Sequence, residues 1–207
     1  MRIHIYIEGG GDSKEQHARL REAFSKLFER AGFGGRMPRL IAGGGRQQTF
    51  DRFCTAIRGA NSGDHPVLLV DSEDPVETHD FAPGSDVPWR HLAEREGWVR
   101  PDGMASNQVH LMVTCMETWI VADRETLRRV FADCLQENAL PAEDDLEKRT
   151  RHDIQQSLEK ATRGCGRDRR YEKGNRSFKL LGQLDPVELK ARLPHFVRLC
   201  NSLNDVR

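Results

Sequence analysis

Three apolar runs in this chain of 207 residues each lead directly into an acidic residue. The runs and their acids are residues 3–7 with Glu8, residues 67–70 with Asp71, and residues 109–116 with Glu117. Short continuous apolar runs bounded by turn residues are typical of strands buried in a parallel sheet. The carboxyl ends of such strands lie side by side at one edge, where open α/β sheets gather their functional groups. The pattern therefore predicts a cluster of carboxylates at that edge.

Strand and helix patterns alternate along most of the chain. The strands are expected at residues 3–7, 37–42, 67–70 and 109–113, each followed by glycines or turn residues and then by a helical pattern. This order predicts an α/β fold with a mostly parallel four-stranded sheet flanked by helices. We expect this domain to span residues 1–132, and a helical C-terminal extension with a basic loop at 163–179 to span residues 133–207.

The overall charge and the cysteines narrow the function classes. The 32 Lys and Arg residues balance the 32 Asp and Glu residues, so any attraction to nucleic acid depends on how the charges are distributed. The five cysteines are odd in number and contain no CxxC pair, which argues against a disulfide framework and against a zinc site. No apolar run approaches the roughly 18 residues that span a bilayer. We therefore expect a cytoplasmic protein with no membrane partner.

The acids that follow the strands have the chemistry of a metal site. Asp71 and Glu73 are two residues apart, so in an extended chain their side chains point to the same side. Oxygen-only ligands select Mg²⁺ or Mn²⁺, and two such ions can activate a water for phosphodiester cleavage. The expected metal ligands are Glu8, Asp71, Glu73, Asp74 and Glu117. The alternative interpretation is that these acids cap helices or are solvated loop residues.

The basic loop carries groups that suit phosphate. Residues 173–179 (KGNRSFK) combine amines, a hydroxyl and an aromatic ring, and Lys173 and Lys179 are expected to stabilise charge on a scissile phosphate. The residues expected to contact nucleic acid are Arg46, after a glycine cluster, and Arg169, Arg170, Arg176 and Ser177. Phe178 or Tyr171 would stack on an unpaired base. A solvated charged surface is the alternative interpretation.

Four segments together resemble the Toprim fold, the catalytic domain of topoisomerases, DnaG-type primases and OLD-type nucleases. The segments are IYIEGGGD, VLLVDSED, CMETWIVAD and KGNRSFKLL. More narrowly, the chain is similar to small bacterial Toprim-like proteins, some of which are thought to act beside ABC-type ATPases in phage defence. The resemblance implies that Glu8 is the acid after the first strand and that Asp71 and Glu73 are the later acidic pair, with Glu in place of the second Asp. Glu117 resembles the additional acid of nuclease-type members.

The resemblance implies a Mg²⁺-dependent nuclease in which Glu8, Asp71, Glu73, Lys173 and Lys179 are catalytic. DNA is the expected substrate and an ABC-type ATPase the expected partner. A topoisomerase is disfavoured because no tyrosine is suitably placed, and a haloacid-dehalogenase-like phosphatase because no Asp-x-Asp follows the first strand. The alternative function is a non-catalytic partner of an ATPase. DNA versus RNA, the choice of ion and the formation of a homo-oligomer are left open.

Overall fold

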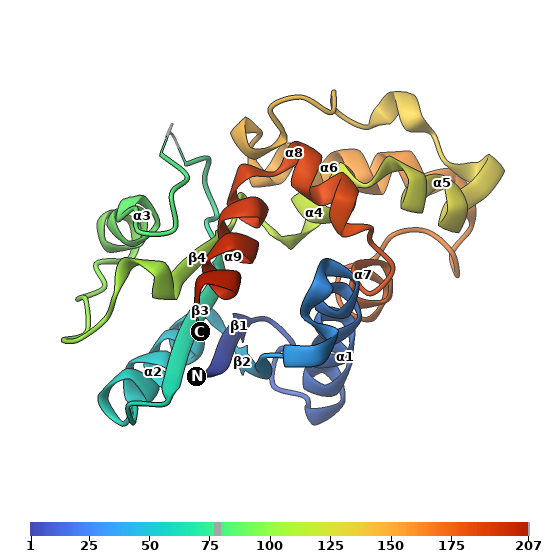
Figure 1. Cartoon of the computed structure of the whole chain (residues 1–207). Helices are drawn as coiled ribbons and strands as arrows, with labels where there is room; N and C mark the ends of the chain where they lie inside the picture. Colours follow the sequence, from blue (N-terminus) through green and yellow to red (C-terminus); the bar gives the residue numbers. More distant parts are fainter. Residues whose placement is uncertain (77–79, 207) are drawn as a thin grey trace.

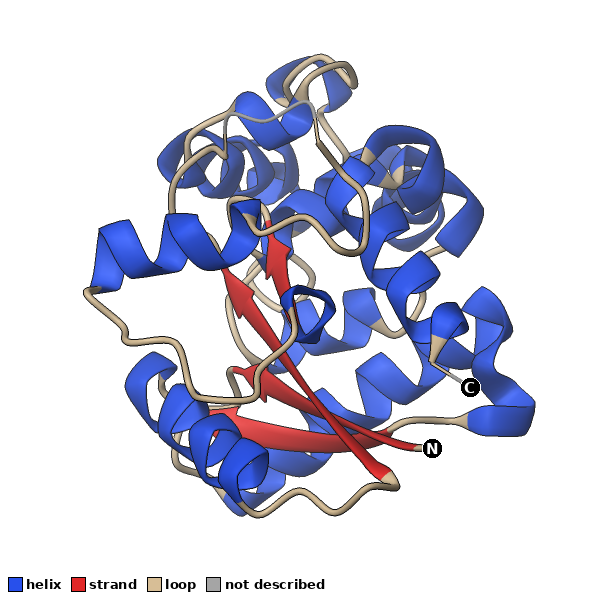
Figure 2. Cartoon of the chain, turned by 60° about the vertical axis from the view of Figure 1, so that its left-hand side comes forward, coloured by secondary structure: helices blue, strands red, loops and turns tan. Residues whose placement is uncertain are grey.

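The computed structural model describes residues 1–76 and 80–206. Within them, four strands form one all-parallel sheet in the order β2-β1-β3-β4. The strands are β1 (Arg2–Glu8), β2 (Arg39–Gly44), β3 (Asp64–Asp71) and β4 (Val109–Met112). Helices flank the sheet, and a helix lies at the C-terminal end (Figure 2). The predicted α/β class is therefore confirmed.

The helices follow the strands and then fill the C-terminal part of the chain (Figure 1). Their bounds are α1 Lys14–Phe28, α2 Arg46–Arg58, α3 Val87–Glu96, α4 Met116–Ala122, α5 Arg124–Phe131, α6 Arg151–Thr162, α7 Asn175–Leu181, α8 Pro186–Arg192 and α9 Pro194–Asp205. None of those within the described residues is long and apolar enough to cross a membrane.

The strand register brings the carboxyl ends of β1 and β3 to the same level. Ile7 pairs with Leu69, so Glu8 lies beside the residue that precedes Asp71. Asp71 itself pairs with Met112 at the end of β4. The two strand-end acids therefore meet at one edge of the sheet, as the apolar runs predict.

Both faces of the sheet are buried. Along β3, Val67 and Leu69 belong to one hydrophobic cluster and Leu68 and Val70 belong to the other. This alternation follows from the twofold period of a strand. It also explains why β3 has a continuous apolar run rather than an alternating pattern.

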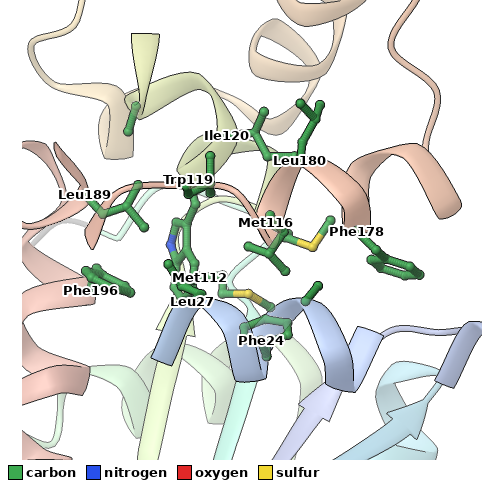
Figure 3. Packing of buried hydrophobic residues seen from close by; sticks show 14 of the residues in the cluster. Phe24, Leu27, Met112, Met116, Trp119, Ile120, Phe178, Leu180, Leu189 and Phe196 are labelled. Carbon is green, nitrogen blue, oxygen red and sulfur yellow. The ribbon is translucent and has the colours of Figure 1, made fainter. Parts of the chain in front are cut away.

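The larger hydrophobic cluster joins the sheet to the C-terminal helices. The Trp119 ring in α4 lies edge-on to Phe24 of α1, with ring centroids 6.1 Å apart, and to Phe196 of α9 at 4.9 Å (Figure 3). Phe178 and Leu189, from α7 and α8, belong to the same cluster. The expected extension at 133–207 is helical and packs into the core that covers the sheet.

Two stretches with a helical sequence pattern are each divided into two helices in the structure, for a local reason. The helical pattern after Met116 divides into α4 and α5 because Asp123 leaves helical geometry and caps α5, accepting a hydrogen bond from the Thr126 amide. The pattern from Pro186 onward divides into α8 and α9 at Pro194, which has no amide proton and restricts the residue before it.

Cys134 and Cys165 form a disulfide, with their Cα atoms 4.9 Å apart. The argument from cysteine count and spacing against a disulfide framework does not extend to this single bond. The two cysteines are 31 residues apart in the sequence and meet because the chain returns at the end of α6. Local spacing therefore gives no sign of the bond. Cys54, Cys115 and Cys200 are free and buried.

We expect Trp119→Ala to lower the free energy of unfolding by about 3–5 kcal/mol, because it empties the centre of the shared core. The measurement is chemical denaturation followed by far-UV circular dichroism. Val187→Ala, at a side chain that is 69% exposed, should change the same quantity by less than about 0.5 kcal/mol. Equal effects of the two substitutions would contradict a core that depends on this ring.

The disulfide predicts a thiol count. The unfolded protein should show three reactive thiols before reduction and five afterwards. Replacing Cys134 and Cys165 with serine should lower the free energy of unfolding by about 3–4 kcal/mol, through the loss of a cross-link over a loop of this length. Five thiols before reduction would show that the bond does not form.

Candidate functional site

A cavity of about 320 Å³ opens at the carboxyl edge of the sheet. Glu8 from β1, Asp71 from β3 and Glu117 from the first turn of α4 line it. Arg151 of α6 and Lys173, in the loop before α7, line it as well. Three acids from the N-terminal part of the chain thus face two cations from the C-terminal part.

Asp71 is a buried acid of the cavity. Its carboxylate Oδ1 accepts a hydrogen bond of 2.9 Å from the Met116 amide. Burial raises the pKa of Asp71 well above its usual value, and the neighbouring carboxylates Glu8 and Glu117 raise it further. Arg151 and Lys173 oppose this shift but do not cancel it. A proton or a cation at Asp71 is therefore favoured over a bare negative charge.

Glu8 is held in place by Arg46. Its Oε2 accepts hydrogen bonds from Arg46 Nη1 at 2.9 Å and from the Asp71 amide at 3.2 Å. Burial is the main cause of the raised pKa of Glu8, and Arg46 counteracts it. Arg46 also donates to Glu96 Oε1 and to the Asp71 carbonyl. The sequence predicts that Arg46 contacts a phosphate. In the structure its guanidinium instead holds Glu8 and the end of β3 in place and does not line the cavity.

The turn after Glu8 requires glycine at residue 10. Gly10 has a φ of +85°, and a Cβ atom there would lie 2.7 Å from His17 Cδ2. The His17 ring in turn donates to the Gly11 carbonyl at 2.6 Å. This close approach returns the chain into α1 while Glu8 stays at the wall of the cavity.

Glu117 is positioned by two side chains from the C-terminal part of the chain. Tyr171 Oη donates to Glu117 Oε1 at 2.7 Å, and Gln155 Nε2 donates to Oε2 at 3.4 Å. Burial raises the pKa of Tyr171, and the Glu117 carboxylate raises it further, so the phenol keeps its proton. Tyr171 is 5% exposed and Phe178 7% exposed. Neither ring is exposed enough to present a face to a base, so the expected base stacking finds no support in this geometry.

Two of the expected metal ligands do not line the cavity. β3 ends at Asp71, and Glu73 has a φ of +68°, so the extended geometry that would align the two side chains is lost. The Glu73 carboxylate instead pairs with Arg151. Asp74 pairs with Arg95 at 2.8 Å and is 60% exposed in its side chain.

The predicted phosphate-binding residues separate into two groups. Lys173 lines the carboxylate cavity, together with Ser177, whose buried hydroxyl donates to the Gly174 carbonyl. Lys179 does not line this cavity. It follows Ser177 by two residues in α7, and two residues along a helix are about 200° apart around its axis. Arg169, Arg170 and Arg176 line a separate hollow with Lys179. The expected catalytic role of Lys179 therefore finds no support in this geometry.

The donor set of the cavity is made of oxygen atoms, which suits a hard divalent cation. Across residues 1–76 and 80–206, however, no three His, Cys, Asp or Glu side chains are grouped so that they could hold a metal ion by themselves. Mg²⁺ commonly uses one or two carboxylates and completes its shell with waters and substrate phosphates. The acids therefore fit a cation that is shared with a substrate, and not a closed protein site.

The raised pKa of Asp71 predicts a pH-dependent gain in stability for Asp71→Asn. The folded protein holds the Asp71 proton more tightly than the unfolded chain does, so wild-type stability falls as the pH rises from about 3.9, the usual value, toward the raised one. Asparagine cannot ionise and still accepts the Met116 hydrogen bond. Urea midpoints should show a stability advantage of Asp71→Asn that grows from pH 4 to pH 8.

The matched control is Asp102→Asn, which neutralises an exposed carboxylate. Its stability relative to wild type should stay nearly constant over the same pH range. A pH-independent difference for Asp71→Asn would mean that Asp71 ionises normally in the folded protein.

Comparison with known proteins gives one match. Neither the curated proteins nor the solved structures contain a significant match to the chain. One family model, described as a domain of unknown function (DUF4276), matches residues 7–204. The match includes the three acids of the cavity and also Arg151, Tyr171 and Lys173, so both parts of the chain fall within one family unit. The chain therefore belongs to the DUF4276 family.

Proposed function

We propose that this protein is a metal-dependent nuclease that hydrolyses phosphodiester bonds at the cavity lined by Glu8, Asp71 and Glu117. The observation that carries the proposal is the buried Asp71 between two further carboxylates, opposite the cations Arg151 and Lys173. The acidic side chains attract a divalent metal ion, and the basic side chains attract a phosphate. The two sides of the cavity thus suit the metal ion and the phosphodiester that such a reaction requires.

Asp71 and Glu8, with Glu117 beside them, would hold Mg²⁺ or Mn²⁺. When bound, the ion would lower the pKa of a water and place a positive charge next to the phosphoryl oxygens. Arg46 donates a hydrogen bond to the Glu8 carboxylate and orients it, and the Tyr171 hydroxyl orients the Glu117 carboxylate in the same way. Lys173 and Arg151 orient the phosphate and offset the charge that develops on it.

The resemblance to the Toprim fold supports nucleic acid as the substrate, with DNA as the first choice. It is also the basis for proposing an ABC-type ATPase as a partner and a role in phage defence. A zero net charge agrees with a partner that delivers the substrate, because the molecule as a whole does not attract a polyanion. A cytoplasmic location follows from the same proposal and stays a prediction.

The test is cleavage of plasmid, linear and single-stranded DNA, and of RNA, by purified protein with Mg²⁺ or Mn²⁺. We expect Asp71→Asn and Glu8→Gln to lower the rate by more than about 100-fold, the upper end for residues that only support a metal ligand. Asp102→Asn should cleave like the wild type. Both active-site variants keep the size of the side chain, so their unfolding curves can confirm that they are folded.

Full cleavage by Asp71→Asn would refute the proposed site. Absence of cleavage by the wild type with every substrate and either ion would refute the nuclease itself. The alternative function, a non-catalytic partner of an ATPase, would then be tested by co-purification of the two proteins.

A further inference from the structure

A second hollow of about 320 Å³ lies between the end of α5, residues 166–174 and α7. Four basic side chains and one acidic side chain line it: Arg169, Arg170, Arg176 and Lys179, with Asp168. This is an excess of positive charge in a molecule whose net charge is zero. Local excess charge of one sign raises the local concentration of ligands of the opposite sign.

Two of these cations hold the loop together. Arg176 Nη1 donates to the carbonyl oxygens of Arg167 and Arg170, at 2.9 and 3.0 Å, and pairs with Glu172 at 3.3 Å. Arg169 donates to the Phe131 carbonyl at 3.2 Å. The loop is therefore fixed against α5 by its own guanidinium groups.

The other two cations are exposed and available. Within the part of the chain that the structure describes, neither Arg170 nor Lys179 pairs with an acidic side chain. They lie on the wall of a hollow that the tethered loop keeps in shape. Such cations bind phosphate at little cost in reorganisation, because the surrounding backbone is already placed.

The basic hollow and the carboxylate cavity both adjoin α7. A groove between α1 and α7 shares Phe178 with the carboxylate cavity and shares Lys179 and Gln183 with the basic hollow. Figure 1 shows α1 and α7 side by side. α7 has seven residues, which corresponds to about 10 Å of helix. Successive phosphates of one stacked strand rise by about 3.4 Å along the axis, so this length corresponds to about three of them.

We propose that the basic hollow binds a second backbone phosphate of the substrate strand, with Arg170 and Lys179 as its ligands. The inference rests on the proposed nuclease function and adds the substrate class: a polynucleotide that extends past the scissile bond, and not a small phosphodiester. Contacts of this kind position a strand without reading its sequence. They predict cleavage that depends on strand length and on salt, with little dependence on sequence.

The binding test uses the full chain carrying Asp71→Asn, so that cleavage does not interfere. Fluorescence anisotropy of labelled single-stranded DNA and RNA oligonucleotides measures affinity over a range of salt concentrations. We expect Arg170→Ala with Lys179→Ala to weaken binding about tenfold or more. The slope of log affinity against log salt should fall by about 0.7, the value for one lost phosphate contact on a single strand.

The matched control replaces Arg58 and Lys190, an exposed arginine and an exposed lysine outside the hollow, with alanine. It removes the same charges from the molecule. Unchanged affinity in the control, together with weakened binding in the hollow variant, supports the site. Equal loss in both variants would show that only net charge matters, and unchanged binding in the hollow variant would overturn the proposal.

A kinetic arm separates this proposal from the catalytic one. With the Asp71 carboxylate intact, the hollow variant should raise KM for an oligonucleotide about tenfold and leave kcat/KM for bis(p-nitrophenyl) phosphate unchanged, since that diester has a single phosphate. Equal loss on both substrates would overturn the binding role. If no variant cleaves anything and only the hollow variant binds weakly, the phosphate site stands and the nuclease proposal falls.

Discussion

The candidate site of this protein is organised around one buried carboxylate, Asp71, with two other carboxylates beside it. Three acids close together in a cavity repel one another, and the rest of the chain supplies what keeps them there. Arg46 binds Glu8, the Met116 amide binds Asp71, and the Tyr171 hydroxyl binds Glu117. These donors satisfy individual oxygens but leave the pKa of Asp71 raised. The remaining imbalance makes the stability lower than a neutral residue at this position would give, and the cation of the proposed function would relieve it.

The C-terminal part of the chain is an integral component of this site. Its α7, α8 and α9 share a hydrophobic cluster with α1 and α4, and its polar residues complete the cavity wall. The disulfide between Cys134 and Cys165 fixes the chain at the start of the basic loop, so the loop begins from a defined point. The match of the family model over residues 7–204 agrees with one unit in which sheet and helices act together.

The elements that the sequence could predict are those governed by local periodicity. The order of strands and the positions of Glu8, Asp71 and Glu117 follow from apolar runs that end in acids, because strand ends in a parallel sheet coincide. Glu73 could not be placed in this way, since the chain leaves the strand at Asp71 and adopts a positive φ two residues later. Tyr171 and the disulfide depend on contacts over tens of residues, for which spacing along the chain gives no signal.

The hydrogen bond between Tyr171 and Glu117 joins residues that are synthesised 54 positions apart, so it forms late during synthesis. The sheet and all three acids leave the ribosome before the C-terminal residues that hold Glu117 and complete the cavity wall. A nascent chain that ends before α6 has the acidic edge but lacks Arg151, Gln155, Tyr171 and Lys173. The cavity is therefore completed only when the chain has been made as far as α7 and its C-terminal part has packed against the strand ends.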